Sequence, residues 1–402
     1  MTAAGRDAAV LVDVPGGVCA VSGIRAAGIA AGLRPSGKPD LALVAADRTV
    51  AAAAVQTTNQ VSAMPVRVTA RHVADGRARA VLLNAGNANV CTGPDGLAVA
   101  QESAVVAAAA LDCAPTDILL CSTGVIGVPL AREPLLPAIP RVASALSPDG
   151  GAAAARAIMT TDTLAKQAAV RLTDGEAGCV VGGMAKGSGM IAPEMATMLC
   201  VLTTDAAAPV TELQPLLAEV VAETFGRITV DGCQSTNDAV VLLATGAAPV
   251  GAASLRRALT AVCAELAEQL VRDGEGAERV LHVTVGGARS EADALGVARA
   301  IAASALVRTA IAGGDPNWGR VLAAMGAGPV LFDPDRVEVA FGATTVCRGG
   351  TVAAFDRPKA SAELVGPDVT LRVDLGLGAA EATVLTCDLT HDYIRINAEY
   401  TT

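Results

Sequence analysis

Short β-branched runs alternate with alanine-rich stretches along most of this chain. The runs at 40–46, 78–86 and 116–124, among them "DLALVAA" and "ARAVLLNAG", have the length and composition of strands. The stretches at 95–111 and 252–272 instead repeat apolar residues at the i, i+3, i+4 spacing of a helix. This order of elements predicts an α/β protein.

Further strands are expected in the last third of the chain, with fewer helices between them. They lie at 280–287, 336–342, 368–376 and 381–390. Strands joined by short connections usually pair antiparallel, so we expect antiparallel pairing here. The expected fold is therefore one of mixed sheets sandwiched by helices, with candidate domain boundaries at the Pro-, Gly- and Asp-rich spacers 145–151 and 328–335.

The stretch "TMLCVLTT" (197–204) is apolar on both of its faces. Both faces are suited to burial, as in a strand that lies in the middle layer of a sandwich. A threonine at the start of such a strand is by itself only a good strand former. The preceding segment "GGMAKGSGMIAPEMA" (182–196) is rich in glycine and carries Lys186. Nucleotide binding is the less favoured interpretation of this segment, because Lys186 precedes the GSG instead of following a long glycine loop into a helix, as it does in a phosphate loop.

Composition and charge narrow the class of protein. The chain has 402 residues, of which 52% are hydrophobic and 17% charged, enough for two ordinary domains or one large α/β unit. No apolar run reaches the roughly 18 residues of a membrane span, and the amino terminus lacks the pattern of a secretory signal, so a soluble cytoplasmic protein is expected. A net charge of -10 and a 2% aromatic content provide neither a basic stripe nor stacking platforms for nucleic acid. Small-molecule partners are favoured.

Cysteine and histidine usage predicts no metal centre. The ten cysteines form no CxxC pair, and several lie in apolar strands, which is typical of reduced, buried thiols. His72, His282 and His391 are far apart in sequence. They therefore form neither a metal-binding spacing nor a sequence-local catalytic triad.

The run "LLCSTGVIG" (119–127) ends a strand at Ser122, Thr123 and Gly124. A tight turn there would expose backbone N–H groups, and a threonine hydroxyl beside a glycine amide can bind a developing oxyanion. An ordinary turn has the same composition, so the motif alone leaves both readings open.

These motifs taken together closely resemble the ornithine acetyltransferase family, also called glutamate N-acetyltransferase. The resemblance extends from about Gly23 to Thr402 and rests on eight segments: "MAKGSGMIAPEMATML", "STGVIG", "NAGNAN", "SGKPDLAL", "MTTDT", "DGEGA", "DPNWGR" and "YIRINAEYTT". It implies a self-processing fold related to that of the self-processing aminopeptidases. Any one of these segments would be weak evidence, and their combination is specific.

The resemblance implies that the chain cuts itself between Ala196 and Thr197. The products would be an α chain (1–196) and a β chain (197–402) that remain associated, two of each. Cleavage would free the α-amine of Thr197, whose ordinary pKa of about 7.7 to 8.0 suits it to take the proton of the adjacent hydroxyl. The implied reaction is a ping-pong transfer of acetyl from N-acetylornithine to glutamate within cyclic arginine biosynthesis, without a cofactor. Whether acetyl-CoA also serves as an acetyl donor stays open.

The same resemblance assigns residues to roles. It makes Thr197 the nucleophile and Thr123 with Gly124 the oxyanion hole, and it makes Lys186 suited to a carboxylate and Glu275 to an ammonium group. The implied substrate contacts are Thr160, Lys186, Thr197, Glu275, Asn397 and Thr402. Thr161 and Thr163 lie so close to Thr160 that the choice among them stays open. Ala85 and Cys233 depart from the family pattern and receive no role.

Two other classes of protein fit parts of the sequence. A self-processing amidase or aminopeptidase would use the same nucleophile with water as the acceptor. A non-catalytic α/β binding protein would use Thr197 only to begin a strand, and its chain would remain uncut. A role in specialised metabolism in place of arginine biosynthesis is also left open by the sequence.

Overall fold

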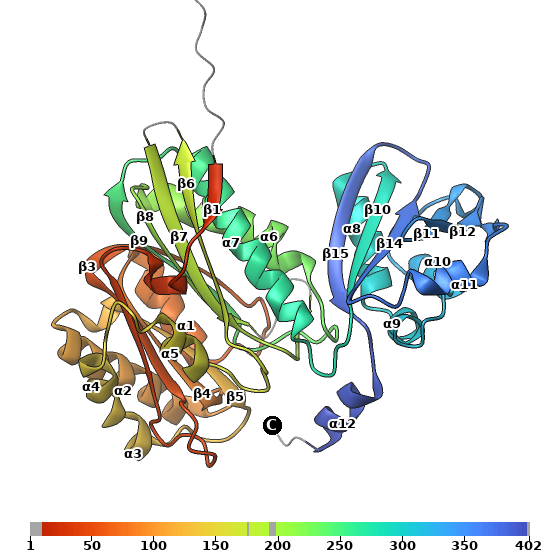
Figure 1. The fold of residues 1–402 in the computed structure, drawn as a ribbon. Helices are drawn as coiled ribbons and strands as arrows, with labels where there is room; N and C mark the ends of the chain where they lie inside the picture. Colours follow the sequence, from red (N-terminus) through yellow and green to blue (C-terminus); the bar gives the residue numbers. More distant parts are fainter. Residues whose placement is uncertain (1–9, 175–176, 193–197, 400–402) are drawn as a thin grey trace, which may run out of the picture.

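The structure is a computed structural model that describes residues 10–174, 177–192 and 198–399. Ala196, Thr197 and Thr402, which include the expected cleavage junction, lie outside these described residues. The chain forms two lobes, each built on its own sheet (Figure 1). The division falls between residues 272 and 280, so the spacers 145–151 and 328–335 are not domain boundaries. Each of those spacers joins two elements of the same lobe.

The sheet of the first lobe contains nine strands in the part of the chain described. In chain order they are β1 (Val10–Asp13), β2 (Ile24–Ile29), β3 (Leu41–Gln56), β4 (Arg77–Asn87), β5 (Ile118–Val125), β6 (Lys166–Asp174), β7 (Ala177–Lys186), β8 (Leu199–Ala206) and β9 (Ala239–Ala248). Across the sheet the order is β1-β6-β7-β8-β9-β3-β4-β5, with β2 paired to β3. Since β8 pairs antiparallel with β7 and parallel with β9, the sheet is mixed, as expected.

Helices cover both faces of this sheet (Figure 1). They are α1 (Met64–His72), α2 (Gly93–Leu111), α3 (Arg132–Leu135), α4 (Ala138–Ser144), α5 (Gly151–Ala157), α6 (Val210–Glu223) and α7 (Ala252–Arg272). α6 and α7 pack on one face of β8 and β9, and α5 packs on the opposite face. α1, α2 and α4 pack over β3, β4 and β5. The expected sandwich of helices around mixed sheets is thus confirmed.

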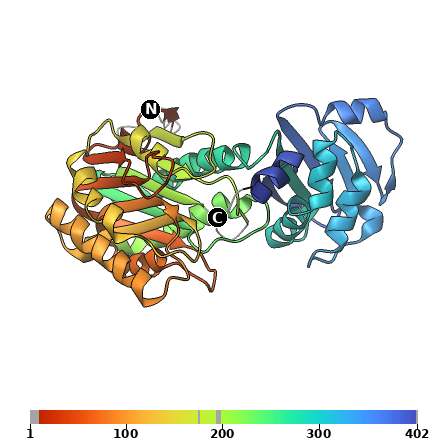
Figure 2. The same ribbon diagram turned by 90° about the horizontal axis from the view of Figure 1, so that it is seen from below.

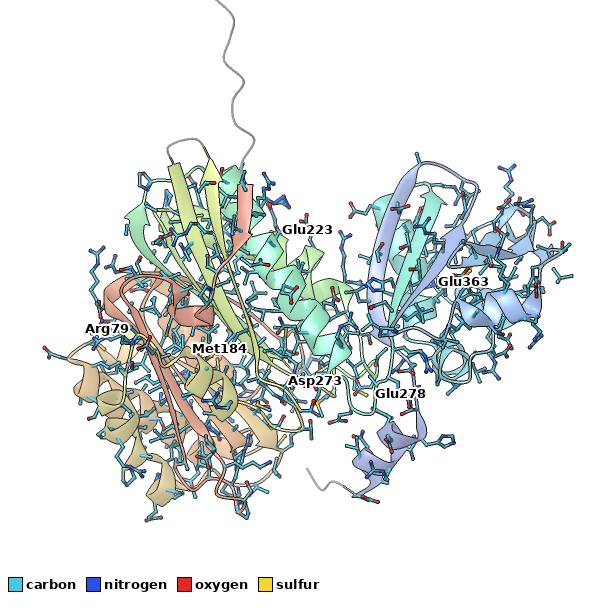
Figure 3. All side chains as sticks on the ribbon, viewed as in Figure 1. Arg79, Met184, Glu223, Asp273, Glu278 and Glu363 are labelled. Atoms are coloured by element: carbon cyan, nitrogen blue, oxygen red, sulfur yellow. The ribbon has the colours of Figure 1, made fainter. Side chains whose placement is uncertain are left out.

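β8 lies in the middle of this sheet with both faces buried. Cys200 and Leu202 point into the core formed with α6 and α7. Leu199 and Val201 point into the core formed with α5, near the labelled Met184 of Figure 3. The two-sided burial expected for 197–204 is therefore confirmed over residues 198–204.

The second lobe is a six-stranded sheet covered by helices on one face only. Its strands are β10 (Val280–Ala288), β11 (Glu338–Phe341), β12 (Thr344–Arg348), β13 (Thr351–Val352), β14 (Asp368–Asp374) and β15 (Ala380–Cys387), and its helices are α8 (Glu291–Ala302), α9 (Ala305–Ala312), α10 (Trp318–Gly326) and α11 (Arg357–Ala362). Pairing is antiparallel as expected, except that β10 and β14 run parallel. The alternating burial along β14 shows that one face of the sheet remains open to solvent.

The last helix, α12 (His391–Glu399), leaves β15 and returns to the first lobe. Seen from below, it lies in the space between the two lobes (Figure 2). The Tyr393 hydroxyl is 3.3 Å from Asp231 Oδ2, and Asn397 Nδ2 donates to Glu275 Oε2 at 2.8 Å. These contacts bring the carboxyl-terminal motif next to segments of the first lobe.

No single helix in the described ranges is long and apolar enough to cross a membrane. The helices α8 and α9, which are bent at 61° to each other, reach the length and composition of a membrane span only when they are taken together. Both helices of that pair contribute buried residues to the core of the second lobe.

The contact between β2 and α5 predicts a specific intolerance to substitution. A Cβ on Gly28 would lie 2.1 Å from the carbonyl oxygen of Ala153, a backbone atom that cannot swing away. We expect Gly28→Ala to lower the free energy of unfolding by roughly 1–3 kcal/mol, measured by urea denaturation. Gly326→Ala is the control, because nothing lies within 4 Å of its new Cβ and alanine favours a helix. Equal stability of the two variants would contradict this account of the packing.

The melting temperature should change in opposite directions when each of two buried aspartates is replaced by asparagine. Asp238 is fully buried; its Oδ1 accepts the Met198 N–H at 3.0 Å, and its Oδ2 has no hydrogen-bond partner in the described structure. Burial raises the pKa of the Asp238 carboxyl well above its ordinary value, against the opposing effect of the Met198 amide. Ionisation of this group therefore opposes folding as the pH rises above the unfolded-state value of about 4.

We expect Asp238→Asn to raise the melting temperature by about 2–4 °C at neutral pH, with the gain shrinking as the pH falls toward 4. Asp388→Asn should have the opposite effect at neutral pH, because Asp388 Oδ2 accepts from the Arg279 guanidinium at 3.0 Å and its loss leaves that charge without this partner. Thermal melts followed by circular dichroism over this pH range would test both. A lower melting temperature for Asp238→Asn at neutral pH would show that its charged form stabilises the fold.

Candidate active site

One small cavity, of about 130 Å³, is lined by those residues singled out from the sequence for binding or oxyanion stabilisation that the structure describes. Its polar lining includes Thr123, Thr160, Thr161, Lys186, Ser235, Asn237, Glu275 and Asn397, together with Gly124 and Gly189. These residues come from the ends of β5 and β7, from the loops before β6 and β9, from the loop after α7, and from α12. Five loop or strand ends and one helix therefore build a single site.

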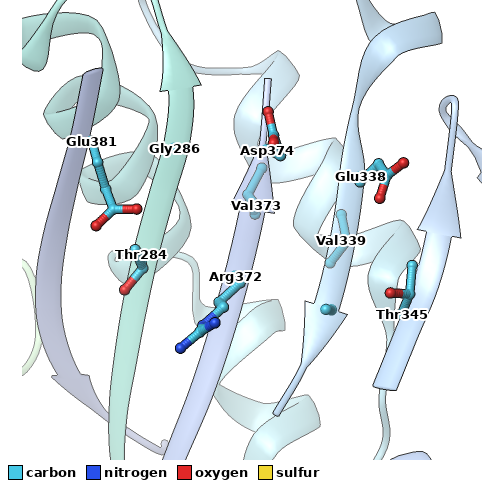
Figure 4. A pocket seen from close by; sticks show the side chains of 10 residues that line it. Thr284, Gly286, Glu338, Val339, Thr345, Arg372, Val373, Asp374 and Glu381 are labelled. Carbon is cyan, nitrogen blue, oxygen red and sulfur yellow. The ribbon is translucent and has the colours of Figure 1, made fainter. Parts of the chain in front are cut away.

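A larger hollow, of about 430 Å³, lies on the open face of the second sheet (Figure 4). Thr284, Glu338, Arg372, Asp374 and Glu381 line it. It contains none of the residues expected from the sequence to act in chemistry, so the smaller cavity is the candidate site.

The turn that ends β5 has a backbone shape that only glycine can adopt without strain. Gly124 has a φ of 130°, and a Cβ there would lie 2.3 Å from the carbonyl carbon of Gly86 on the paired strand β4. Asn237 Nδ2 donates to the carbonyl of Ser122 at 2.8 Å and to that of Ala88 at 2.7 Å. This amide fixes the turn from the side of β9, so Thr123 and Gly124 are presented to the cavity in one orientation.

Lys186 ends β7 and is almost fully buried, with 2% of its side chain exposed. Its Nζ lies 3.3 Å from Thr123 Oγ1 and 4.0 Å from Asp162 Oδ2. Burial lowers the pKa of Lys186, and the Asp162 carboxylate acts against that shift. Because an ammonium can only donate, the Thr123 hydroxyl accepts from Lys186, and its own hydrogen remains free to donate.

Glu275 and Asn397 form the acidic side of the cavity. Asn397 Nδ2 donates to Glu275 Oε2, and the Glu275 N–H donates to the Ser188 carbonyl at 2.8 Å. A Cβ at position 189 would lie 2.5 Å from the Glu275 carboxylate, so a larger residue there would displace that side chain. Asp231 lies nearby, and its Oδ2 accepts a hydrogen bond from the Tyr393 hydroxyl. Burial raises the pKa of the Asp231 carboxyl.

The structure separates the hydroxyls of "TTDT". Thr160 and Thr161 both line the cavity, and the Thr161 and Ser188 hydroxyls are 2.7 Å apart. Thr163 instead hydrogen-bonds to Asp273 through its N–H and hydroxyl. The choice left open by the sequence thus narrows to Thr160 and Thr161.

Met198 is the first described residue after the expected nucleophile. It is fully buried, and its N–H donates to Asp238. Asp238 stands between Asn237 of the cavity wall and the first residue of β9. Thr197, Ala196 and Thr402 themselves lie outside the described residues. Their roles stay predictions.

Several residues of the site were not identified by sequence reasoning. Asp162, Lys166, Asp231, Asn237 and Asp273 are polar, largely buried, and placed within or directly behind the cavity wall. Asp162 and Asp273 stand inside the quoted motifs "MTTDT" and "DGEGA", which was the available signal. Lys166 contacts Asp162 four positions earlier, but its contact with Asp273 and those of Asn237 with Ser122 and Ala88 join residues more than 100 positions apart and leave no local signal.

The cavity combines one buried ammonium, one carboxylate and neutral hydrogen-bond donors. Such a set can bind a molecule with an ammonium and a carboxylate, and it can stabilise an oxygen that gains negative charge. Within the described ranges, no group of three or more His, Cys, Asp or Glu side chains could hold a metal ion.

Comparison with known proteins identifies the family of this chain. The model of the ArgJ family matches residues 25–402. The arginine biosynthesis bifunctional protein ArgJ of Symbiobacterium thermophilum is 48% identical over 397 residues, covering 96% of this chain and 99% of that protein. The protein of the same name from Thermobifida fusca is 48% identical over 388 residues, covering 96% of this chain and 100% of its own.

Solved structures with similar sequences cover about half of this chain. The arginine biosynthesis bifunctional protein of Bacillus halodurans is 38% identical with a TM-score of 0.48, covering 49% of this chain and 97% of its own. The ornithine acetyltransferase of Mycobacterium tuberculosis, solved with ornithine, is 42% identical with a TM-score of 0.42, covering 46% of this chain and 98% of its own. From the family match and the identity over nearly the whole length, the chain belongs to the ArgJ family.

Proposed function

We propose that this protein transfers an acetyl group from N-acetylornithine to glutamate through an acetyl-Thr197 intermediate, after cutting itself between Ala196 and Thr197. Membership of the ArgJ family identifies it as an acetyltransferase of arginine biosynthesis. The proposed reaction and its intermediate are supported by one observation above all. A single cavity is lined by Thr123, Gly124, Lys186, Glu275 and Asn397.

Self-cleavage would begin with attack of the Thr197 hydroxyl oxygen on the carbonyl carbon of Ala196. The C–N bond breaks as the acyl group moves to oxygen, and the nitrogen gains the proton that the hydroxyl loses. Water then hydrolyses the ester, which frees the Ala196 carboxylate and leaves Thr197 with an α-amine beside its hydroxyl. The amine supplies the base that a threonine nucleophile requires.

The pairing of β7 with β8 supports the continued association of the two fragments. β7 belongs to the 1–196 side and β8 to the 197–402 side, and they pair over six residues from Lys186↔Leu199 to Val181↔Thr204. β9, also from the second fragment, pairs with β3 of the first. Cutting the chain therefore leaves one sheet shared by both products, and two copies of each are expected from the family resemblance.

Acetyl transfer would follow in two steps. The α-amine takes the Thr197 hydroxyl proton as the oxygen attacks the acetyl carbonyl, and ornithine leaves with that proton. The glutamate amine then attacks the acetyl ester, which restores the threonine hydroxyl. In both steps the acetyl oxygen gains negative charge, and the Thr123 hydroxyl with the Gly124 N–H would stabilise it.

Charge placement supports an amino-acid substrate. Lys186 would attract a substrate carboxylate, and Glu275 with Asn397 would bind an ammonium group. Thr160, Thr161 and Thr402 would complete the hydrogen bonding. Whether acetyl-CoA also acetylates the enzyme is a separate question, answered by incubating the protein with acetyl-CoA and glutamate alone.

Self-cleavage at the Ala196–Thr197 junction can be tested directly. Intact mass measurement of the purified protein should give two fragments that meet at Ala196 and Thr197, and Thr197→Ala should remain one chain without transferase activity. Thr309→Ala, which alters an exposed threonine of α9, should be cut as the parent is. A parent protein that remains whole at full activity would contradict the proposed activation, and hydrolysis exceeding transfer to glutamate would favour an amidase.

The proposed role of the Thr123 hydroxyl as an oxyanion donor can be tested by removing that hydroxyl. Thr123→Val keeps the side-chain shape and removes the hydroxyl, so kcat should fall by roughly 100- to 1000-fold with little change in KM. Ile126→Val, a change in the apolar lining of the same cavity, should alter kcat by less than about threefold. If Thr123→Val retains the kcat of the control, the hydroxyl does not stabilise the transition state.

A further inference from the structure

Four charged side chains are buried together at the candidate site, one of them in the cavity wall and three behind it. Lys166, Asp162, Asp273 and Lys186 have side-chain exposures of 1%, 0%, 7% and 2%. We call these four residues the buried charge cluster. Two positive and two negative groups balance one another in it, which is the condition under which buried charges are tolerated.

Asp162 contacts more partners than any other member of this cluster. Its Oδ1 accepts from Lys166 Nζ and from the Gly187 N–H, both at 2.7 Å. Its Oδ2 accepts from the Thr160 N–H at 2.8 Å and lies 4.0 Å from Lys186 Nζ. One carboxylate therefore fixes two segments that supply cavity residues, the loop of Thr160 and the end of β7.

Lys166 connects Asp162 to a third segment of the cavity wall. Its Nζ donates to Asp273 Oδ2 at 2.5 Å, and that oxygen also accepts the Thr163 N–H at 3.0 Å. Asp273 follows the end of α7 and stands two residues before Glu275 (Figure 3). The cluster thus spans from the lysine side of the cavity to its acidic side.

Lys186 receives opposing electrostatic influences from its surroundings. Burial has the largest effect and lowers its pKa; among charged neighbours, Asp162 and Glu275 raise it, and Lys166 and Arg34 lower it. Asp238 also lies close enough to interact with Lys186. Asp162 is the nearest counter-charge and the one that the structure pairs with Lys186.

We propose that Asp162 is a positioning residue that keeps Lys186 charged and directed at the Thr123 hydroxyl. The Gly187 and Thr160 N–H groups hold the Asp162 carboxylate in place, and Lys166 competes with Lys186 for its charge. The inference rests on the proposed acetyl transfer. Asp162 itself does not line the cavity, so it would act on the reaction only through Lys186 and the loop of Thr160. With Lys186 charged, the Thr123 hydroxyl accepts from it and directs its own hydrogen to the substrate oxygen.

Two variants of the cluster should shift the pH dependence in opposite directions. Asp162→Asn removes the counter-charge of Lys186 and leaves Lys166 in place, so Lys186 loses its proton at a lower pH. The alkaline limb of kcat/KM should then move to lower pH by about one unit or more, and kcat near pH 8 should fall by roughly 10- to 100-fold. Lys166→Met removes a repelling cation and frees Asp162 for Lys186, so its alkaline limb should move to higher pH.

The matched control is Asp388→Asn. Asp388 is a buried, arginine-paired aspartate at the end of β15, so its substitution tests whether loss of any buried ion pair changes the profile. Its alkaline limb should coincide with that of the parent. Completeness of self-cleavage and a circular dichroism spectrum would establish that each variant has folded before its kinetics are compared.

The outcomes separate this inference from the proposed function. If the parent transfers acetyl groups and folded Asp162→Asn keeps the parental alkaline limb and kcat, the role of Asp162 is refuted while the function stands. Shifts of Asp162→Asn and Lys166→Met in the same direction would also refute it, because general loosening of the site would explain both. If Asp162→Asn does not fold, the direction of the Lys166→Met shift decides. Absence of transfer by the parent would overturn the function and this inference together.

Discussion

The pairing of β8 with a strand on each side is the constraint on which the rest of this structure depends. β8 is hydrogen-bonded to β7 and β9 and covered by helices on both faces, so nothing in its interior reaches solvent. A strand held in this way cannot slip in register, because a shift by one residue would exchange the side chains of its two cores. The start of β8 is therefore held in one position. The loop after β5, the loop after β7 and the loop before β9 lie around it.

The candidate site shows how a protein can bury charge without losing stability to it. The lysine side of the cavity is balanced by aspartates behind its wall, and the acidic side is capped by an amide from α12. Each charged group retains at least one partner, which limits the cost of desolvation. Asp238 has the least complete set of partners: its Oδ1 accepts from the N–H of Met198, the residue that follows the expected nucleophile, and its Oδ2 has no hydrogen-bond partner in the described structure.

Periodicity was sufficient to predict the fold class, because strands of this length and helices with this spacing leave few other arrangements. It could not predict the parallel pairing of β10 with β14, which depends on strands brought together over about 90 residues. The division between lobes was also missed, since residues 273–279 are a motif-bearing loop without the composition of a linker. Thr123, Gly124, Lys186 and Glu275 were found because they stand inside recognisable motifs. Lys166 reaches Asp273, and Asn237 reaches Ser122 and Ala88, through contacts between residues more than 100 positions apart, and a single sequence contains no local signal for such contacts.

The return of α12 to the first lobe has a consequence for synthesis. Asn397 is among the last described residues, yet it completes the acidic side of a cavity whose other walls are made from residues 88–275. A nascent chain still attached to the ribosome can fold most of the first lobe, but it cannot close that side of the cavity until the second lobe has been translated and α12 has emerged. Closure of this cavity is accordingly a property of the finished polypeptide, and a chain terminated before α12 would leave its acidic side incomplete.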